Sequence, residues 1–505
     1  MKQTVKLMAL ILSVLMTGAC FTACGSGDSG TQVVPYTEKT FSTYSASGDY
    51  FFSTTEIPTF NVLPLKDITG LRLSSLNSQF SFSAECEGDV KLYVWTEGIS
   101  DPDEDVTVKV IIDGVNKKTM RWISSGGDIT IADGLPRGNH TFTIEKISGG
   151  ANLYIGSVTL NGEMTEAPAL SIENGIWVEV FAPAGGDDEY CSFNVYTQTT
   201  HHSGEYFIRY KFVYEYDDID ETLTWYTGPN TSANRMNYRI KTGQIVKKSD
   251  SGFLTVYNIL QGGEISMAMK EQDPLTGATA GDFVGGFHGD ENIKSATLVL
   301  DGDTKIELYQ GKAGLYNCTT VEFKQFTAID RCHTAYNKVM NHNQHYLIDT
   351  NGIRLNQQVE WLSGDFTPSP YETFLQMFTL YRENIDRVGD YLTTIVNLLD
   401  EDGKVLDSVD TTTITVPSGK ESTPTSQSDK YRYAEYIGEE KGIYAIAGYQ
   451  LVDNSCFANN AYVAVRRAQG DNKWYPSFKG ATATPAAGEV WNVNAFYYID
   501  YNPRN

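Results

Sequence analysis

The sequence predicts an all-β protein in which a jelly-roll or β-sandwich domain is followed by a larger antiparallel β-sandwich. Three observations lead to this expectation. Apolar and polar residues alternate with a period of two in many segments, no stretch shows an equally clear 3.6-residue stripe, and the turn dipeptides DG, NG and GG recur. A period of two places successive side chains on opposite faces of a strand, and the glycines supply the positive-φ positions that hairpins need.

The first residues have the layout of a signal peptide. Lys2 and Lys6 precede an apolar run from Leu7 to Met16, which is followed by small residues and cysteine. The run is about half as long as the roughly 20 apolar residues that a membrane-spanning helix needs. We therefore expect residues 1–23 to be removed.

Two cysteines offer a cleavage point, Cys20 and Cys24, and each directly follows an alanine. We prefer Cys24, because it leads into GSGDSG, a composition typical of flexible tethers, and we assign residues 24–43 to that tether. The stretch resembles a bacterial lipoprotein signal, which implies a diacylglyceryl thioether on the mature N-terminal cysteine. The expected location is outside the cytoplasm, lipid-anchored to the bacterial cell membrane and facing outward. Ordinary secretion is the alternative.

Charge limits the classes of partner. The 505 residues carry a formal charge of −24, which becomes −26 after cleavage because the removed segment holds Lys2 and Lys6 but no acid. Nucleic-acid binding depends on Lys and Arg that neutralise phosphates, so this balance argues against a nucleic-acid partner. A strongly anionic polymer is also disfavoured unless a cationic cleft reverses the field locally.

The remaining cysteines do not suggest a framework of disulfides. They are Cys86, Cys191, Cys318, Cys332 and Cys456, an odd number without a CxxC pair. Cys318 and Cys332 could be cross-strand neighbours, but we expect free buried thiols.

Residues 44–165 are expected to form the first domain. Short alternating segments such as KLYVWTE and VTVKVIIDG recur between turn signals about every 8–12 residues, the spacing of a sandwich or jelly roll. His140 stands at the start of one such segment and is expected to be structural. A polar joint containing Pro168 follows the domain.

The segments VTVKVIIDGVNKK, ITIADGLPRGNHTFTIEKIS and LYIGSVTLNG resemble the non-catalytic jelly-roll domain of family-two carbohydrate esterases. In those esterases the jelly roll precedes a Ser-Gly-Asn-His hydrolase domain. Here the GDS sequence occurs at Gly27-Asp28-Ser29, and neither GDS nor a GxSxG elbow occurs after residue 160. Deacetylation therefore does not follow from the resemblance.

Residues 170–505 are expected to form one large sandwich that carries the function, with a smaller terminal sandwich after about Val416 as the competing partition. In YFIRYKFVYEYDD, one face holds mainly Tyr and Phe, and the other holds Arg209, Lys211 and Glu215. Residues 371–388 are the best helical candidate and fit a strand plus a loop as well.

Six of the seven histidines lie between His201 and His345, so we look for chemistry in this second domain. In GDFVGGFHGDENI, the residues His288, Asp290 and Glu291 stand among glycines, which let a backbone approach a ligand closely. A histidine with two carboxylates can supply a general base or metal ligands. The alternative is a turn in which these side chains cap their own amides. The motif resembles uncharacterised bacterial surface or phage-type sandwich proteins, and no chemistry follows from that likeness.

The segment DRCHTAYNKVMNHNQHYLI adds His333, Tyr336, Asn337 and His342. On a strand, His342 and His345 would point to opposite faces, so they suit one metal site only if a bulge intervenes. A site assembled across strands from His288, His333 and His342 stays open. We assign no metal, and the cofactor is unknown.

The next strand, IRLNQQVEWL, is expected to turn a polar face outward. One side holds Ile353, Leu355, Gln357, Val359 and Trp361, and the other holds Arg354, Asn356, Gln358 and Glu360. Such a face suits the concave side of a glycan-binding sandwich, and it suits a solvated sheet equally well. The tyrosine-rich segments YRYAEYIGEEKGIYAIAGY and AFYYIDY offer rings that could stack on sugars.

Two hypotheses follow for an extracellular polysaccharide as partner. The first is an enzyme: a lyase would abstract a proton with Tyr or His while Arg or Asn neutralises a uronate, and a glycoside hydrolase would need two carboxylates. The candidate catalytic residues are His288, Asp290, Glu291, His333, Tyr336, Arg354 and Glu360, and the candidate substrate contacts are Arg235, Arg239, Asn337, His342, Asn356, Gln358 and Trp361. The concentration of histidines and the size of the second domain favour the enzyme, which is our main expectation. The alternative hypothesis is a non-catalytic glycan-binding or adhesin-like lipoprotein, which the acidic surface and the lack of a recognised catalytic motif favour.

Overall fold

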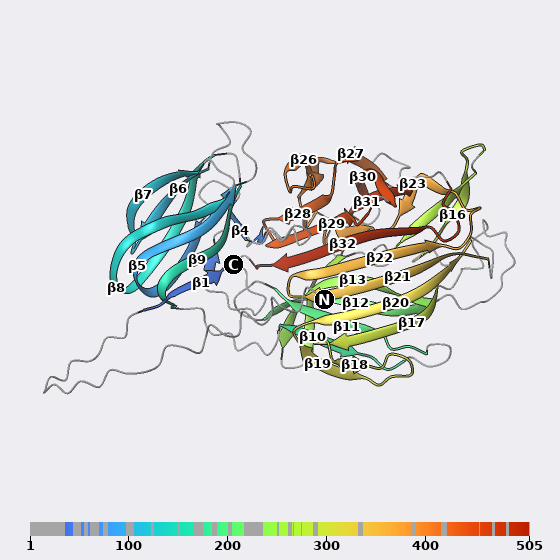
Figure 1. The fold of residues 1–505 in the computed structure, drawn as a ribbon, viewed down its shortest axis with the longest axis horizontal. Helices are drawn as coiled ribbons and strands as arrows, with labels where there is room; N and C mark the ends of the chain where they lie inside the picture. The colour runs from blue at the N-terminus through green and yellow to red at the C-terminus, as the bar shows by residue number, and fades with distance from the viewer. Residues whose placement is uncertain are drawn as a thin grey trace, which may run out of the picture. The chain divides into compact units, whose positions relative to one another are not determined.

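The protein is described by a computed structural model. It describes residues 36–503 except for 44–51, 55–58, 61–69, 74–78, 97–105, 123–125, 150–151, 166–174, 184–188, 200–204, 217–235, 250–251, 261–264, 266, 274, 286–290, 332–336, 386, 388, 416–421, 454, 467–469 and 481–483. Within this part of the chain every regular element is a β-strand apart from a 3₁₀ turn over Thr411–Thr413 (Figure 1). The all-β prediction is confirmed.

The strands from residue 38 to residue 164 form one nine-stranded antiparallel sheet. Its order is β3-β4-β9-β5-β8-β6-β7, with β1 on β9 and β2 on β5. The bounds are β1 Glu38–Ser42, β2 Phe52–Thr54, β3 Thr59–Phe60, β4 Leu71–Leu73, β5 Gln79–Thr96, β6 Val106–Ile112, β7 Val115–Trp122, β8 Gly127–Ser148 and β9 Leu153–Met164.

Alternation along the long strand β5 explains why this sheet folds around an apolar interior. Phe80, Phe82, Val90 and Leu92 are buried, and the residues between them turn outward. Between the two apolar pairs the register of β5 shifts against β8 and β9 around Gly88. Gly88 has a φ of 81°, a conformation that glycine adopts without steric cost.

Residues 176–501 supply two ten-stranded sheets. The first has the order β19-β10-β11-β12-β13-β14-β24-β31-β30-β27, and we call it the front sheet; the second has the order β18-β17-β20-β21-β22-β32-β29-β28-β25-β26, and we call it the back sheet. These names do not refer to the direction of view in the figures. The front-sheet bounds are β10 Ile176–Val180, β11 Phe193–Gln198, β12 Tyr206–Tyr216, β13 Met236–Ser249, β14 Gly252–Leu260, β19 Gly314–Cys318, β24 Phe378–Tyr381, β27 Ser422–Ser428, β30 Cys456–Arg466 and β31 Asp471–Gly480. The back-sheet bounds are β17 Glu291–Leu300, β18 Thr304–Ile306, β20 Val321–Asp330, β21 Lys338–Asp349, β22 Gly352–Trp361, β25 Ile395–Leu399, β26 Val405–Asp410, β28 Tyr433–Gly438, β29 Ile443–Leu451 and β32 Val490–Tyr501.

The strands near the C-terminus are divided between the two sheets. Strand β32 lies between β22 and β29 in the back sheet, whereas β27, β30 and β31 complete the front sheet. The strands that follow Val416 therefore do not make a sandwich of their own, and the competing partition is wrong. Residues 371–388 hold strands rather than a helix: β23 (Pro368–Phe374) joins β15 (Ala268–Gln272) and β16 (Thr279–Val284) in a small third sheet, and β24 belongs to the front sheet.

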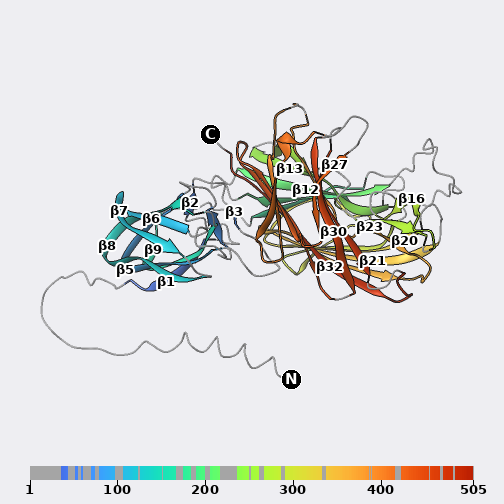
Figure 2. The ribbon, with the colours of Figure 1, turned by 90° about the horizontal axis from the view of Figure 1, so that it is seen from above.

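The front and back sheets pack face to face on one large apolar core (Figure 2). Aromatic rings join them: Phe193 and Phe212 of the front sheet both meet Phe323 of the back sheet edge-on, and Phe378 stacks on Tyr497. Because each sheet has its inner face in this core, a ligand can reach only its other face, at places where nothing else packs on it.

Most tyrosines of the two tyrosine-rich segments belong to buried surfaces, which overturns the idea that they are spare rings for sugars. Tyr436, Tyr444 and Tyr449 are at most 1% exposed, and Tyr497 and Tyr498 are similarly buried. A buried phenol usually finds a hydrogen-bond partner: the Tyr444 hydroxyl donates to Glu435 and the Tyr449 hydroxyl donates to the carbonyl of Tyr431. Among the described residues, the hydroxyls of Tyr436 and Tyr497 have no such partner.

A buried ion pair connects the first sheet to the back sheet. Arg72 of β4 and Glu435 of β28 lie 2.5 Å apart, with side chains 5% and 1% exposed. One apolar cluster contains residues from both sides, among them Leu71, Tyr444 and Phe496. Removal of one partner from a buried ion pair is strongly destabilising, so this contact should matter for the stability of the chain.

Three smaller expectations meet the structure as follows. Cys86, Cys191, Cys318 and Cys456 are free and buried, as predicted, while Cys332 lies outside the described residues. His140 is structural, as predicted, because its two ring nitrogens lie 2.8 Å from Asp113 Oδ2 and from the carbonyl of Pro136. No helix in the described part of the chain is long and apolar enough to cross a membrane.

Candidate functional site

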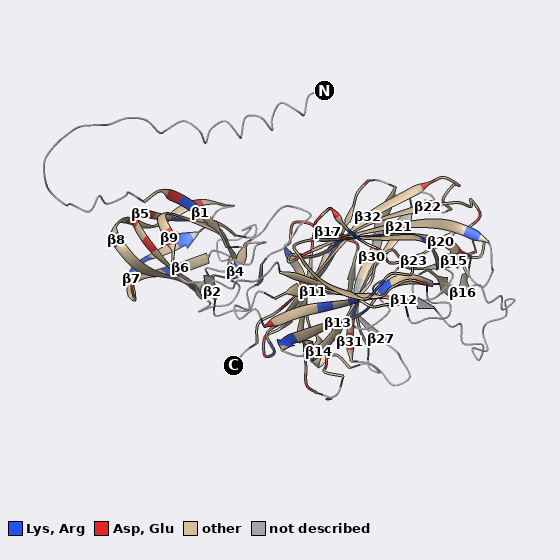
Figure 3. Cartoon of the chain, turned by 90° about the horizontal axis from the view of Figure 1, so that it is seen from below, with Lys and Arg blue, Asp and Glu red and all other residues tan. Residues whose placement is uncertain are grey.

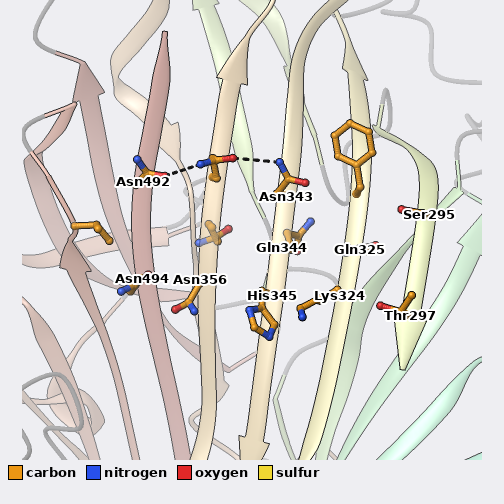
Figure 4. A pocket seen from close by; sticks show the side chains of 14 residues that line it. Ser295, Thr297, Lys324, Gln325, Asn343, Gln344, His345, Asn356, Asn492 and Asn494 are labelled. Carbon is orange, nitrogen blue, oxygen red and sulfur yellow. Dashed lines mark hydrogen bonds between the residues drawn. The ribbon is translucent and has the colours of Figure 1, made fainter. Parts of the chain in front are cut away.

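The predicted polar face of β22 lines a groove on the outer side of the back sheet. Leu355, Gln357 and Val359 point into the sandwich, and Asn356 and Gln358 point outward. The groove has a volume of about 660 Å³ and crosses strands β17, β20, β21, β22 and β32 (Figure 4). We call it the amide groove, and its lining residues are Ser295, Thr297, Lys324, Gln325, Phe326, Asn343, Gln344, His345, Asn356, Gln357, Gln358, Val452, Asn492 and Asn494.

Strand register arranges the outward side chains of the amide groove in two parallel rows. The upper row runs across the strands as Ser295, Phe326, Asn343, Gln358 and Asn492. Directly paired residues of an antiparallel sheet have neighbouring side chains. The order of the row is therefore set by backbone pairing and not by the side chains themselves.

The lower row lies two residues further along each strand. It runs as Thr297, Lys324, His345, Asn356 and Asn494. With a strand spacing of about 4.8 Å, the four steps from β17 to β32 give each row a length of roughly 19 Å. The groove is thus long and narrow in the direction across the strands.

Hydrogen bonds tie the amides of the upper row into a directed chain. Asn343 Nδ2 donates to Gln358 Oε1 at 3.4 Å, and Gln358 Nε2 donates to Asn492 Oδ1 at 3.2 Å (Figure 4). Asn492 Nδ2 donates in turn to the carboxylate of Asp453 at 2.7 Å. A carboxylate at the end of such a chain orients every amide in it, and each amide keeps a second N–H and acceptor capacity for a ligand.

The lower row holds the titratable groups. His345 Nε2 lies 2.7 Å from Glu322 Oε1, and the same carboxylate oxygen lies 2.5 Å from Lys324 Nζ. Burial and the charge of Lys324 lower the pKa of His345 despite this carboxylate, so the imidazole is neutral at pH 7. Within the described residues the amides of Asn356 and Asn494 have no hydrogen-bond partner, which leaves them for a ligand.

Two predicted site residues, Glu291 and His342, meet inside the sandwich instead. Glu291 Oε1 accepts a hydrogen bond from the Thr327 hydroxyl at 2.6 Å and lies 3.1 Å from His342 Nδ1. Both side chains are at most 2% exposed. Gln344 joins this buried network through His342, and Tyr346 through Gln344. A polysaccharide cannot reach these groups in the present structure.

The other described candidates lie at different places. Arg354 and Glu360 share the outer face of β22 with Asn356 and Gln358, and Glu360 accepts a hydrogen bond from Asn341 at 2.9 Å. Arg239 is buried on β13 of the front sheet, away from the amide groove. Asn337 is exposed just before β21.

Trp361 has a core role in place of the expected substrate contact. Its side chain is fully buried and packs against Trp491 and Phe366. The period of two along β22 already assigned it to the inner face, and the structure bears out that assignment.

His288, Asp290, His333, Tyr336 and Arg235 lie outside the described residues, as does Cys24. Their roles stay predictions. Among the residues that the structure does describe, no three His, Cys, Asp or Glu side chains come together in a way that could hold a metal ion.

Sequence reasoning missed most of the amide groove. Asn343, Asn492 and Asn494 were not candidates, and His345 and Lys324 were not assigned to a site. A signal existed for Asn492 and Asn494, since VWNVNAFYYIDY alternates with the same period as β22. What the sequence did not show is that β32, more than 130 residues further on, pairs with β22.

Comparisons with known proteins do not assign a family. No protein family model matches the chain, and no curated protein matches it. Among solved structures, a family two carbohydrate esterase from Cellvibrio japonicus is 15% identical over 27% of this chain and 38% of its own, with a TM-score of 0.22. A family two carbohydrate esterase from Clostridium thermocellum in complex with cellohexaose is 13% identical over 23% of this chain and 34% of its own, with a TM-score of 0.19. The CBM36-1 domain of a multidomain xylanase from the hindgut metagenome of Trinervitermes trinervoides is 18% identical over 23% of this chain and 99% of that domain, with a TM-score of 0.17.

The chain therefore spans little more than a third of the esterases it matches. The resemblance to family-two carbohydrate esterases that the sequence suggested recurs among these structures, over a minor share of this chain. Identities and TM-scores this low carry no statement about activity or ligand.

Proposed function

We propose that this protein is a surface lipoprotein that binds an extracellular polysaccharide along the amide groove. The observation that carries the proposal is the pair of cross-strand rows, in which Asn343, Gln358, Asn492, Asn356 and Asn494 present amides side by side. An amide both donates and accepts hydrogen bonds, as a sugar hydroxyl does. Two rows of roughly 19 Å suit a linear chain of several sugar units better than a compact small molecule.

Preorganisation supports binding. The hydrogen-bond chain that ends on Asp453 holds the upper amides in place before a ligand arrives, so little side-chain freedom is lost on association. The sheet that carries the amides is anchored by its buried inner face. Such a site can bind a ligand without a conformational change.

Hydrolysis draws no support from this groove. A glycoside hydrolase places two carboxyl groups about 5–9.5 Å apart around the bond it cleaves, and the described residues that line the amide groove include no carboxylate. The nearest carboxylates already have partners: Glu322 contacts Lys324 and His345, and Asp453 accepts a hydrogen bond from Asn492.

Elimination is the second candidate, because one observation favours it. The neutral imidazole of His345 could accept the proton from the carbon that bears the carboxylate of a uronate, and Lys324 beside it could neutralise that carboxylate. The electrons of the broken C–H bond then form a carbon–carbon double bond as the neighbouring glycosidic C–O bond breaks, and the leaving oxygen takes a proton from water. The product would be an unsaturated uronate, which absorbs ultraviolet light.

One experiment separates binding from both cleavage reactions. The purified mature chain is run through native gels that contain single polysaccharides, and the same polymers are incubated with the protein while reducing ends and ultraviolet absorbance are followed. Retardation with neither product supports the binding proposal. Absorbance that a His345→Ala variant loses supports elimination, and new reducing ends without absorbance would overturn both.

A further inference from the structure

We propose that the outer face of the front sheet holds a second binding groove, selective for a polysaccharide that bears anionic substituents such as carboxylates or sulfates. This inference goes beyond the amide groove, because it concerns the other sheet, other residues and another ligand chemistry. The proposed groove has a volume of about 580 Å³. Its lining residues are Glu179, Phe181, Ser192, Asn194, Arg209, Lys211, Val213, Lys241, Thr242 and Gln244.

A β-bulge creates the cationic character of this groove. Lys211 of β12 pairs with Thr242 of β13, but the next residue, Phe212, pairs with Ile240, so that Lys241 is an extra residue in β13. Bulges let two consecutive side chains oppose one residue of the neighbouring strand. Burial agrees, since Ile240 and Gly243 face inward while Lys241 and Thr242 are both half-buried on the outer side. Lys241 therefore shares the outer face with Lys211.

The two lysines affect each other electrostatically. Burial and the positive charge of Lys211 lower the pKa of Lys241, which is the result expected of two like charges in a partly desolvated place. An anion between them would remove this repulsion.

Arg209 adds a third, fixed cation. Its Nε donates to Gln244 Oε1 at 2.7 Å and its Nη2 donates to Thr255 Oγ1 at 3.0 Å. These neutral partners orient the guanidinium without neutralising it. Within the described residues no carboxylate forms an ion pair with Arg209 or Lys211.

Among the described residues that line the groove, the one carboxylate is occupied by neutral donors. Glu179 Oε2 accepts hydrogen bonds from the Tyr196 hydroxyl at 2.5 Å and from Asn194 Nδ2 at 3.0 Å. The described lining therefore holds three cationic side chains and one carboxylate, on a chain whose formal charge is −24. A local cationic cleft of this kind is what a polyanion requires on an acidic protein, and Figure 3 marks Lys and Arg in blue along the strands of this sheet.

The groove continues along the sheet, which favours a chain-like ligand over a single ion. Gln244 lines both this groove and a neighbouring one of about 650 Å³, whose lining includes Tyr257, Asn258, Arg387 and the ion pair of Lys441 with Asp390. Gln244 Nε2 donates to Asn258 Oδ1 at 2.6 Å, so the two are joined by a hydrogen bond. From β10 to β14 the path crosses five strands, or roughly 19 Å.

The test compares a double variant, Lys211→Gln/Lys241→Gln, with a charge-matched control, Lys305→Gln/Lys312→Gln, whose exposed lysines lie in the β18–β19 region. Native gels contain polygalacturonate, its methyl ester, or dextran sulfate. We expect wild type and control to be retarded by at least one of the two polyanions, the ester to retard them at least tenfold less, and the double variant to lose at least tenfold in affinity. Retardation by polygalacturonate alone assigns carboxylate as the ligand group, and by dextran sulfate alone assigns sulfate.

Three results would overturn the proposal. They are retardation of the wild type by neither polyanion, an equal loss of affinity in the double variant and the control, and binding of the methyl ester as tight as that of the polyanion. Thermal melting of both variants shows whether each of them is folded. An Asn356→Ala/Asn494→Ala variant of the amide groove should leave polyanion retardation unchanged, so failure here is distinguishable from failure of the amide groove.

Discussion

The clearest pH-sensitive contact at the scale of single residues is that between His140 and Asp113. Both ring nitrogens of His140 lie 2.8 Å from acceptors, the Asp113 carboxylate and the Pro136 carbonyl. Burial alone would lower the pKa of His140, but these hydrogen bonds raise it above its usual value. The pKa of Asp113 is lowered: burial opposes this, and the hydrogen bonds from His140 and Thr141 outweigh it.

This pair should stabilise the protein over a limited range of pH. The His140 contribution is complete below the ordinary histidine pKa of about 6.5 and is lost as pH rises through the raised, folded value. The Asp113 contribution is complete above about pH 4 and is lost as pH falls through the lowered, folded value. Melting temperatures of wild type and His140→Gln should therefore differ most between about pH 4 and pH 6.5. A difference that stays constant up to pH 9 would contradict this assignment.

Glu291 is expected to act as a structural residue. Replacing it by alanine removes the carboxylate that accepts from the Thr327 hydroxyl and faces His342 Nδ1, and a hydrogen bond to a charged group contributes about 1.5–3 kcal/mol. Among the described residues, the Thr327 hydroxyl keeps only the His342 carbonyl at 3.3 Å, and His342 Nδ1 keeps Gln344 at 3.1 Å. Glu291→Ala should lower the free energy of unfolding in urea by roughly 2–4 kcal/mol. The exposed Glu307→Ala is the control, with an effect within about 0.5 kcal/mol. A fully stable Glu291→Ala that had lost turnover would restore its catalytic assignment.

At the scale of elements, alternation predicted strands and their faces well. The inner and outer sides of β12 and β22 agree with the burial of Tyr210, Leu355 and Val359 and the exposure of Asn356. A period of two says which face a side chain takes, but it does not say which strand lies beside it. The amide groove depends on that second fact, because its rows combine strands from β17 to β32.

Two other misses have local physical causes. The sequence contains more tyrosines than the cores were expected to hold, because it does not show that buried acceptors such as Glu435 bind their hydroxyls. The bulge that brings Lys241 beside Lys211 leaves no plain mark in the sequence, since it is a property of the pairing of β12 with β13.

The junction of β4 with β28 should be a sensitive point. Glu435 is 1% exposed and holds Arg72, Asn397 and Tyr444, so Glu435→Gln removes a buried charge that faces a buried guanidinium. We expect a loss of about 3–5 kcal/mol in the free energy of unfolding, measured by urea denaturation. The exposed neighbour variant Glu439→Gln should lose no more than about 0.5 kcal/mol. Equal losses for both would show that the ion pair contributes little.

At the scale of the whole molecule, the sandwich offers ligands two polar outer faces. One presents neutral amides with His345, and the other presents three cations around a bulge. Since the inner faces share one core, the grooves lie on separate surfaces and their occupancy should be independent. A protein held at a surface by lipid could in this way contact two kinds of polymer.

The lipid anchor is predicted from the sequence, and the prediction can be tested in cells. Cys24→Ala should remove the site of the lipid thioether, so the protein should be released into the medium or remain as an unprocessed precursor. Labelling with a fatty acid, followed by recovery of the protein, decides the matter. Label that survives in Cys24→Ala and disappears in Cys20→Ala would move the anchor to Cys20.

The most direct measurement for the account as a whole is the affinity of Asn356→Ala/Asn494→Ala for whichever polysaccharide retards the wild type. Both amides are open to a ligand, so their loss should leave the melting temperature unchanged while it removes two or more hydrogen bonds of about 0.5–1.5 kcal/mol each. Affinity should fall roughly tenfold or more, and Gln310→Ala, an exposed amide outside the groove, should bind as the wild type does. A stable double variant with wild-type affinity would contradict the claim that the amide groove binds the polymer.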